Sequence, residues 1–141
     1  GRKLELLKSI IDKNNLLNCK FLDPMNRNML IQEYISADIL FLHLNNYEAF
    51  KKVLPSKIFE YAASSKPIIA GLEGYSKKFI NDNIDNSYIF RPCNHIEALD
   101  KIQMINLNHV NRENFINKFS RKKITYDMLN SILTYIHDFK K

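Results

Sequence analysis

The sequence is poor in cysteine and has no long apolar run. Its two cysteines, Cys19 and Cys93, stand far apart in the 141 residues without a Cys-x-x-Cys spacing. This argues against a disulfide framework or a cysteine-rich zinc site and is typical of a reducing compartment. No apolar run approaches the roughly 20 residues that a membrane-spanning helix needs, and no signal peptide is recognisable. We therefore expect a cytoplasmic protein.

Several catalytic motifs are missing as well. The sequence has no Ser-His-Asp order, no pair of carboxylates spaced for hydrolysis and no phosphate-binding P-loop. The spacing of its histidines does not fit a metal site; they are His43, His95, His109 and His137. We expect neither a metal nor a cofactor.

The composition is that of an ordinary folded domain. Hydrophobic residues make up 45% of the chain and charged residues 26%, both typical of globular proteins. A chain of this length can bury a substantial core, and no linker, repeat or low-complexity segment divides it. The sequence predicts one domain over residues 1–141.

The formal net charge is +6, and the end of the chain is its most basic part. From residue 111 onward, seven lysines and arginines stand against three acidic residues. Three interpretations remain open: the solvated basic face of a helix, contact with anionic lipid or another domain, and contact with nucleic acid. No nucleic-acid-binding fingerprint supports the third. Peripheral contact with the inner face of the cell membrane is thus a second expectation beside a cytoplasmic location.

Hydrophobic periodicity predicts helices and strands in alternation. Helical spacing predicts helices over residues 2–15, 26–36, 76–81, 96–105, 112–119 and 121–139. Short apolar runs predict strands over residues 19–22, 38–44, 67–70 and 87–90, with a polar loop over 45–52. Asn94 and Ser120 are suited to cap the helices that follow them.

The alternation predicts an α/β fold. Strands separated by helices favour a parallel, Rossmann-like sheet with helices on both faces. In such a sheet, ligands bind beyond the carboxyl ends of the strands. The loops expected to reach that edge are residues 23–25, 43–56, 71–74 and 91–94.

Residues 54–70 form the segment around which the rest of the chain is organised. After a buried strand, Pro55-Ser56-Lys57 predicts the start of a helix, and Lys66-Pro67 predicts its end. Backbone N–H groups, a hydroxyl and a cation at a helix start suit a phosphate. Glu60 follows one turn later, so this face offers a grip for a nucleoside diphosphate. Simpler interpretations are helix capping by the serine, a solvated lysine, and a glutamate paired with that lysine.

Several stretches together resemble one family. They resemble, in sequence and in order, the nucleotide-sugar half of GT-B glycosyltransferases. The stretches are residues 37–40, 54–62, 66–69, 90–94, 97–99 and 119–121. More narrowly, they resemble the family-4 retaining enzymes of bacterial surface polysaccharide synthesis. The resemblance implies transfer of a sugar, as in a hexosyltransferase, from a nucleoside diphosphate to a glycan or lipid-linked acceptor. It implies uridine as the usual base, and no metal.

The resemblance also implies that the chain is incomplete as an enzyme. Family members have two Rossmann-like domains, the first for the acceptor and the second mainly for the donor. Residues 1–141 correspond to the second, C-terminal domain without its first strand and without the Arg/Lys pair that meets the donor phosphates there. We therefore expect the isolated chain to be inactive alone and to need an N-terminal acceptor-binding domain.

Carried over residue by residue, the resemblance assigns roles around the central helix. Glu60 matches the second acid of the paired-glutamate motif and would bind the ribose hydroxyls. The first acid is replaced by Lys52, which leaves the choice of sugar open. Pro55 stands where a glycine N–H usually meets the diphosphate, and proline has no N–H. Ser56 and Lys57 would then supply the catalytic contacts to the departing diphosphate.

Other candidate binding residues follow the predicted strands. Leu22 and Met25 stand where family members read the base through backbone groups, although ordinary Asp-Pro turn chemistry also explains this stretch. His43 ends a strand at the ligand edge and is either structural or close to the donor. Gly71 and Gly74 either make a turn or let the backbone approach the donor sugar.

Two other functional classes are consistent with parts of the pattern. A non-catalytic sugar-nucleotide-binding or partner module would share the donor site and need a separate acceptor domain. A receiver-like signalling domain would share the alternation of strands and helices. It needs aspartates clustered at the carboxyl ends of strands, however, and Asp38 stands at the start of one.

Overall fold

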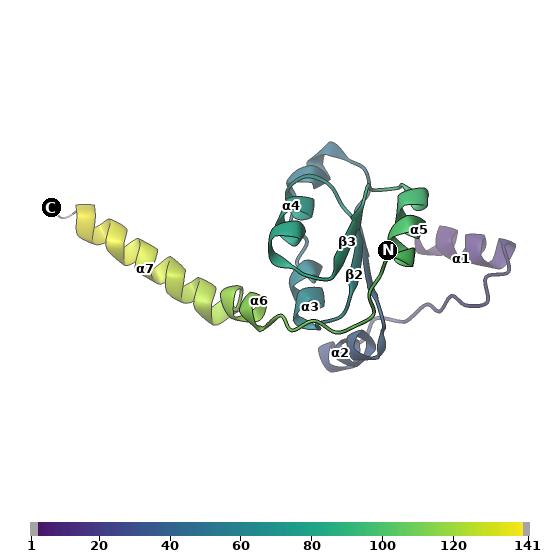
Figure 1. Ribbon diagram of the computed structural model, residues 1–141, viewed down its shortest axis with the longest axis horizontal. Helices are drawn as coiled ribbons and strands as arrows, with labels where there is room; N and C mark the ends of the chain where they lie inside the picture. Colours follow the sequence, from purple (N-terminus) through teal and green to yellow (C-terminus); the bar gives the residue numbers. More distant parts are fainter. Residues whose placement is uncertain (1–2, 140–141) are drawn as a thin grey trace. The chain divides into compact units, whose positions relative to one another are not determined.

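The structure is a computed structural model that describes residues 3–139 (Figure 1). The chain divides into two compact units, Gly1–Leu30 and Ile31–Lys141, and each is described by itself. The first unit carries helix α1 (Leu4–Lys13), and the division between the units falls within α2 (Arg27–Ser36). The second unit carries the sheet and the remaining helices.

The first unit contains a predicted helix but not the predicted strand. α1 lies within the range expected to be helical, of which residue 2 is outside the described residues. The strand predicted over residues 19–22 is wrong, because all four residues are exposed and in neither helix nor strand. A strand needs a neighbour to satisfy its backbone groups. Within residues 3–139, no ladder pairs this segment with another strand.

Three parallel strands build the sheet of the second unit. They are β1 (Leu40–His43), β2 (Ile68–Gly71) and β3 (Ser87–Phe90), and they lie in the order β1-β2-β3. The register pairs the first residues of all three strands, so they start and end together. The predicted α/β class is confirmed, with three described strands instead of four. The open parallel sheet with flanking helices is compatible with a Rossmann-like half domain.

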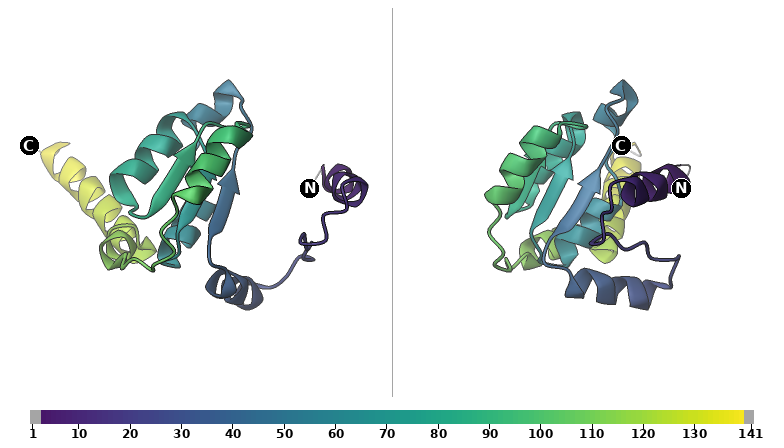
Figure 2. Two further views of the ribbon diagram at one scale, coloured as in Figure 1. Left: turned by 45° about the vertical axis from the view of Figure 1, so that its right-hand side comes forward. Right: turned by 90° about the vertical axis from the view of Figure 1, so that its right-hand side faces the viewer.

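Helices cover both faces of this sheet (Figures 1 and 2). The crossover helices α3 (Lys57–Ala63) and α4 (Gly74–Asn83) lie on one face, and α5 (His95–Gln103) packs on β2 and β3 from the other. Crossovers between parallel strands are right-handed, so strands in sequential order place both connecting helices on the same side. The polar loop predicted over residues 45–52 contains a short 3-10 helix, η1 (Glu48–Lys52).

Alternate strand residues supply the core on the α3 and α4 face. Leu40, Leu42, Ile68 and Ala70 are buried there against apolar side chains of both helices. Successive strand residues point to opposite faces, so Phe41 lies on the α5 face, where it is 55% exposed. The outer part of that face, at β1, is therefore more open than the core side.

Four phenylalanines join α6 (Glu113–Lys118) to the crossover helices. Their ring centroids lie between 4.7 and 6.3 Å apart, within the range of favourable aromatic pairs. They are Phe59, Phe79, Phe115 and Phe119. This cluster extends the core past the edge of α3 and α4.

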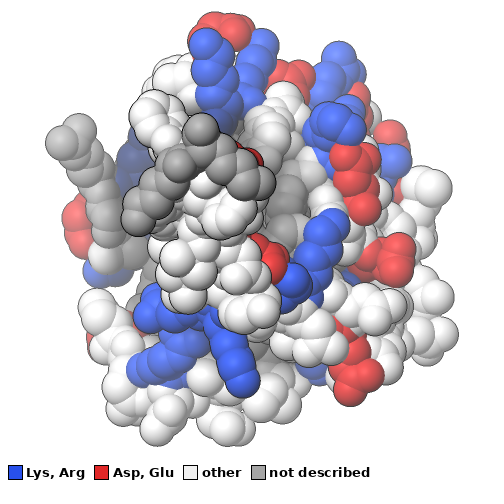
Figure 3. Space-filling view, turned by 90° about the vertical axis from the view of Figure 1, so that its left-hand side faces the viewer, with Lys and Arg blue, Asp and Glu red and all other residues white. Residues whose placement is uncertain are grey.

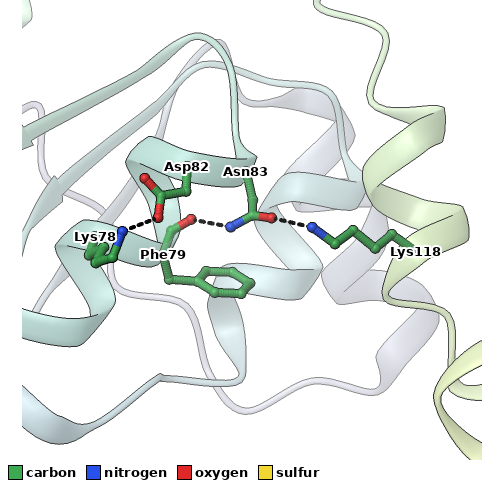
Figure 4. A network of polar contacts seen from close by, with 5 residues as sticks. All are labelled: Lys78, Phe79, Asp82, Asn83 and Lys118. Atoms are coloured by element: carbon green, nitrogen blue, oxygen red, sulfur yellow. Dashed lines mark hydrogen bonds and ion pairs between the residues drawn. The ribbon is translucent and has the colours of Figure 1, made fainter. Parts of the chain in front are cut away.

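A chain of polar contacts runs beside this aromatic cluster (Figure 4). The Lys118 ammonium donates to Asn83 Oδ1 at 2.9 Å, and Asn83 Nδ2 donates to the Phe79 carbonyl at 2.9 Å. Lys78 and Asp82 form an exposed pair at 2.6 Å on the same helix, and such pairs contribute little. Among these polar contacts, the hydrogen bond from Lys118 to Asn83 links α6 to α4.

The last helix, α7 (Arg121–Phe139), begins at its predicted cap and presents a long apolar stripe. The Lys123 N–H donates to Ser120 Oγ at 3.2 Å, which confirms the capping prediction. No side chain of α7 is buried. The stripe consists of Ile124, Met128, Leu129, Ile132, Leu133 and Ile136. All six of these side chains are exposed.

Charged side chains of both signs surround this part of the molecule. Figure 3, viewed from the left-hand side of Figure 1, shows basic and acidic side chains interspersed on the visible face. On α7 itself, Lys123 pairs with Asp127 at 2.6 Å. Among residues 3–139, no helix combines the length and apolarity needed to cross a bilayer.

Arg112 holds the amino-terminal edge of the sheet together. The residue is only 3% exposed. Its guanidinium donates to the carbonyl oxygens of Lys66 at 3.0 Å and Asp85 at 2.6 Å, in the segments that lead into β2 and β3. It also donates to the carbonyl of Ala62 near the end of α3, at 3.4 Å. Burial lowers the pKa of Arg112, but an arginine keeps its charge in proteins. One buried cation therefore joins three segments.

Replacing Arg112 should destabilise the fold strongly. Arg112→Met deprives the carbonyls of Lys66 and Asp85 of a charged donor, and such bonds contribute about 1.5–3 kcal/mol each. We expect the free energy of unfolding, measured by urea denaturation, to fall by about 3–5 kcal/mol. Arg112→Lys should recover only part of the loss, because an ammonium lacks the planar fork of donors. The matched control Arg121→Met, on exposed α7, should cost less than about 0.5 kcal/mol. Equal losses in both methionine variants would contradict the role of Arg112.

Candidate functional site

Three loops meet at the carboxyl edge of the sheet, because the parallel strands end in register. They are residues 44–56, 72–73 and 91–94. Together they line a small crevice with Leu44, Asn45, Asn46, Tyr47, Phe50, Lys51, Glu73 and Pro92. Its enclosed volume is about 10 Å³, roughly the space of one water molecule. A larger ligand would therefore lie across the open edge. The fourth loop predicted at this edge, residues 23–25, belongs to the first unit and follows no strand.

Lys51 fixes the wall of the crevice that η1 forms. Its ammonium lies 2.7 Å from Glu48 Oε1 and 3.7 Å from Glu73 Oε2, and the hydrogen bond with Glu48 raises the pKa of Lys51. The Lys51 carbonyl also packs against Gly74, where an added Cβ would collide with it. Gly74 has a φ of +64°, in the left-handed region that favours glycine. This backbone angle fits the predicted role of Gly74 in a turn, and its approach to a donor sugar stays a prediction.

The start of α3 leaves several hydrogen-bond donors unused. The Ile58 N–H donates to the Pro55 carbonyl and the Phe59 N–H to the Ser56 carbonyl, both at 3.1 Å. The N–H groups of Ser56 and Lys57 have no acceptor within residues 3–139, and both residues are exposed. Ser56 has helical backbone angles, and its side chain makes no capping bond. The capping interpretation is therefore wrong, and the hydroxyl is available.

Glu60 lies in the first turn of α3 and is half-buried. Its Oε2 accepts a hydrogen bond from the Tyr34 hydroxyl of α2 at 3.3 Å. The Tyr34 ring in turn packs edge-on against Tyr61, with centroids 5.3 Å apart. No ion pair joins Lys57 to Glu60 in the described chain. The carboxylate is thus oriented by a tyrosine, and its predicted contact with ribose stays a prediction.

His43 ends β1 and crosses over β2 toward β3. Its ring lies beside those of Phe41 and Phe90, with centroids 6.3 and 6.1 Å away, and the two phenylalanine rings also lie 6.2 Å from each other. Gly71 lies beneath it, and a Cβ there would collide with His43 and come within 2.8 Å of the Phe90 ring. Gly71 therefore makes room for side chains of the neighbouring strands. Burial lowers the pKa of His43, and its Nε2 accepts the Cys93 N–H at 3.0 Å.

The loop after β3 is also anchored from α5. The Arg91 N–H donates to Glu97 Oε2 at 2.8 Å, and the Arg91 guanidinium binds the other oxygen of this carboxylate. The backbone hydrogen bond is the largest cause that lowers the pKa of Glu97. Asn94 caps α5 by accepting the Glu97 N–H at 3.1 Å, which confirms the predicted cap. Cys93 has a φ of +63°, so the loop turns sharply between its two anchors.

The other predicted site residues lie in exposed or irregular segments. Lys52 is the exposed last residue of η1, and Pro55 is half-buried before α3. Leu22 is exposed and Met25 half-buried in the irregular part of the first unit. Leu22 and Met25 were predicted to lie at the end of a strand, but residues 19–22 form no strand. Within residues 3–139, no group of three potential ligand side chains is placed to hold a metal.

Sequence reasoning missed the contacts that join distant segments. The hydrogen bond between His43 and Cys93 joins residues 50 positions apart in the sequence, and the bond between Tyr34 and Glu60 joins residues 26 positions apart. No local sequence pattern predicts either bond. One signal was present: the spacing of Asn94 and Glu97 is typical of a helix start at which the acid reaches back. In the structure, that acid reaches past the cap to Arg91.

Comparison with protein-family models, with curated proteins and with solved structures finds no match. Fold and site by themselves define a class: an α/β protein with an open parallel sheet and a crevice at its carboxyl edge.

Gly71→Ala tests the packing beneath His43. The added methyl group collides with the imidazole and with Phe90, and overpacking of this kind costs about 1–3 kcal/mol. In the double variant with His43→Ala, part of the collision is gone. Urea denaturation should then give a combined loss smaller than the sum of the single losses by more than about 0.5 kcal/mol. Additive losses would show that Gly71 and His43 are independent.

Proposed function

We propose that this chain is the donor-binding domain of a retaining, metal-independent GT-B glycosyltransferase of polysaccharide synthesis. The observation that carries the proposal is the start of α3, at the carboxyl edge of the sheet. There the N–H groups of Ser56 and Lys57 are unused, and both side chains are exposed. A hydroxyl, an ammonium and two N–H groups are therefore available within one turn, next to the edge where parallel sheets bind ligands.

These donors suit the diphosphate of a sugar nucleotide. Charged hydrogen bonds from an ammonium to phosphate oxygens are about twice as strong as neutral ones. Because α3 has only seven residues, Ser56 and Lys57 would contribute more than the dipole of the helix. Negative charge grows on the diphosphate as the sugar departs, and fixed donors aimed at that charge stabilise the transition state. Ser56 and Lys57 would take that catalytic role.

Glu60 would bind the ribose of the same nucleotide. A carboxylate has about four acceptor positions, so Glu60 can accept ribose hydroxyls besides the contacts that it already makes. The bond from Tyr34 at 3.3 Å also fixes the direction of the carboxylate. In this proposal Tyr34 positions Glu60 and does not itself touch the donor.

The rest of the reaction would need a second domain. A uridine diphosphate sugar is the donor that the resemblance implies, and an N-terminal domain would hold the acceptor, a glycan or a lipid-linked saccharide. The alternative is a non-catalytic module that binds the sugar nucleotide and joins a separate acceptor domain. Lys52 favours this alternative to a degree, because it replaces an acid of the paired-glutamate motif. Both forms of the proposal require nucleotide binding by this chain.

Titration with UDP, GDP and ADP tests that requirement. Calorimetry on the folded chain should detect binding of at least one of them, with UDP expected to bind most tightly. Lys57→Met should weaken binding about tenfold to a hundredfold, as expected for a lost charged hydrogen bond. The matched control Lys122→Met, on exposed α7, should leave the affinity within about threefold. No binding by a folded sample, or equal effects of the two variants, would overturn the proposal.

The variants Glu60→Gln and Tyr34→Phe distinguish ribose binding by Glu60 from the structural role of the bond between Tyr34 and Glu60. Glu60→Gln keeps the size of the side chain but replaces a charged acceptor, so UDP affinity should fall about tenfold. Tyr34→Phe removes the other partner of the bond at 3.3 Å. It should cost about 1 kcal/mol of stability and lower the affinity much less. If Glu60→Gln leaves the UDP affinity unchanged, Glu60 does not belong to the site.

A further inference from the structure

His43 joins the end of β1 to the loop after β3 through a hydrogen bond that depends on its protonation. Its Nε2 accepts the Cys93 N–H at 3.0 Å, so this nitrogen carries no proton, and the neutral ring carries its proton on Nδ1. An imidazolium has two N–H donors and no acceptor. Protonation of His43 would therefore remove this hydrogen bond, because Nε2–H and the Cys93 N–H would then be two donors facing each other.

The residues around the His43 ring determine its position. Phe41 stacks nearly parallel to it, at 2°, and Phe90 lies at 27° on the other strand. Beneath it, Gly71 offers no Cβ that would push it away. The ring is therefore held over the end of β2, with Nε2 directed at the loop after β3.

The charged groups of the loop after β3 and of α5 are distinct from the residues that pack against the His43 ring. Phe41, Gly71 and Phe90 carry no charge. In the loop, Arg91 is paired with Glu97, and the Cys93 thiol is exposed. Burial is the cause that lowers the pKa of His43. The bond to Cys93 is thus fully present above the ordinary histidine pKa of about 6.5 and is lost as pH falls through the lowered pKa of the folded state.

The loop that His43 holds is a wall of the crevice. Pro92 lines the crevice beside residues of the β1 loop, and it lies between Arg91 and Cys93. Glu97 anchors the loop on the α5 side through the Arg91 N–H. His43 supplies the second anchor, on the β1 side. Without it, the loop would be attached at one end of the turn only.

We propose that His43 is a positioning residue of the ligand site: its neutral imidazole holds the loop of residues 91–94 across the carboxyl edge, where a nucleoside diphosphate binds. The ligand in this proposal rests on the proposed function, but the anchoring of the loop does not. The direction of the pH effect distinguishes positioning from direct contact. A histidine that touched the diphosphate would bind it more tightly when protonated, whereas one that positions the loop through its neutral form binds it more weakly.

Two substitutions distinguish the effect of the hydrogen-bond acceptor at His43 Nε2 from the effect of the imidazole ring itself. In His43→Gln, the side-chain carbonyl can reach the place of Nε2 and accept the Cys93 N–H at every pH. His43→Asn is one bond shorter and cannot reach it. NMR on the labelled full chain follows the Cys93 amide from pH 7.5 to 5, without nucleotide. In the native protein, this amide should shift with the same midpoint as the His43 ring protons. His43→Gln should abolish that titration, and His43→Asn should show the released amide at pH 7.5.

UDP titrations at the two ends of this pH range complete the test. The terminal phosphate of the nucleotide itself titrates near pH 6, so the native protein is compared with His43→Gln at each pH. At pH 7.5, His43→Gln should bind UDP within about threefold of the native protein and His43→Asn about tenfold more weakly, as for one lost hydrogen bond. At pH 5, the native protein should bind UDP more weakly than His43→Gln does.

The two proposals fail in different ways. If the Cys93 amide neither titrates with His43 nor moves in His43→Asn, His43 does not hold the loop, whatever the nucleotide does. Tighter UDP binding by the native protein than by His43→Gln at pH 5 would show direct contact and would also overturn the positioning role. If none of UDP, GDP and ADP binds while the amide behaves as expected, the proposed function fails. The anchoring of the loop by His43 then stands alone.

Discussion

The fold depends on a buried guanidinium at one edge of the sheet. Arg112 precedes α6, yet its donors reach the segments that lead into β2 and β3 and the end of α3. Carbonyl groups at the turns between helices and strands have no ladder partner, and leaving them without a donor is costly. A lysine could serve fewer of them, because only arginine offers a planar fork of donors. One side chain therefore holds the amino edge together, and the loops of the candidate site lie at the opposite edge.

The carboxyl edge is organised differently, by several weaker contacts between its loops. Lys51 joins η1 to Glu73, and His43 joins β1 to the loop after β3. Gly71 and Gly74 lack the Cβ atoms that would obstruct these two arrangements. Each contact is partly exposed, and the pairs of Lys51 are therefore worth little by themselves. An edge built from such contacts can change shape at a modest cost in free energy.

Local sequence patterns predicted the elements that carry their own signals. Residues 87–90 and α7 were found within the predicted bounds, and Asn94 caps its helix, because alternation, periodicity and capping are properties of neighbouring residues. The strand predicted over residues 19–22 failed because a strand exists only through a partner, which a short apolar run cannot specify. The bonds from Tyr34 to Glu60 and from Cys93 to His43 were unpredictable for a related reason. These bonds depend on how the strands and helices are arranged in the folded protein, and the spacing of residues along the chain does not reveal that arrangement.

The distribution of charge at the carboxyl edge decides which cations a diphosphate could meet. Lys51 is already engaged by Glu48 and Glu73, so a phosphate there would have to compete with two carboxylates. Lys52 and Lys57 have no such pairs within residues 3–139, and they stand on either side of the turn at Pro55. If the proposed donor binds there, the missing N–H of the proline would be offset by an extra cation where the resembling enzymes have an acid. In the proposed donor site, this exchange would favour the phosphate side of a sugar nucleotide and would remove a carboxylate that holds the sugar. We therefore expect nucleotide affinity to depend mainly on the diphosphate, with the sugar contributing less than in enzymes that keep both acids.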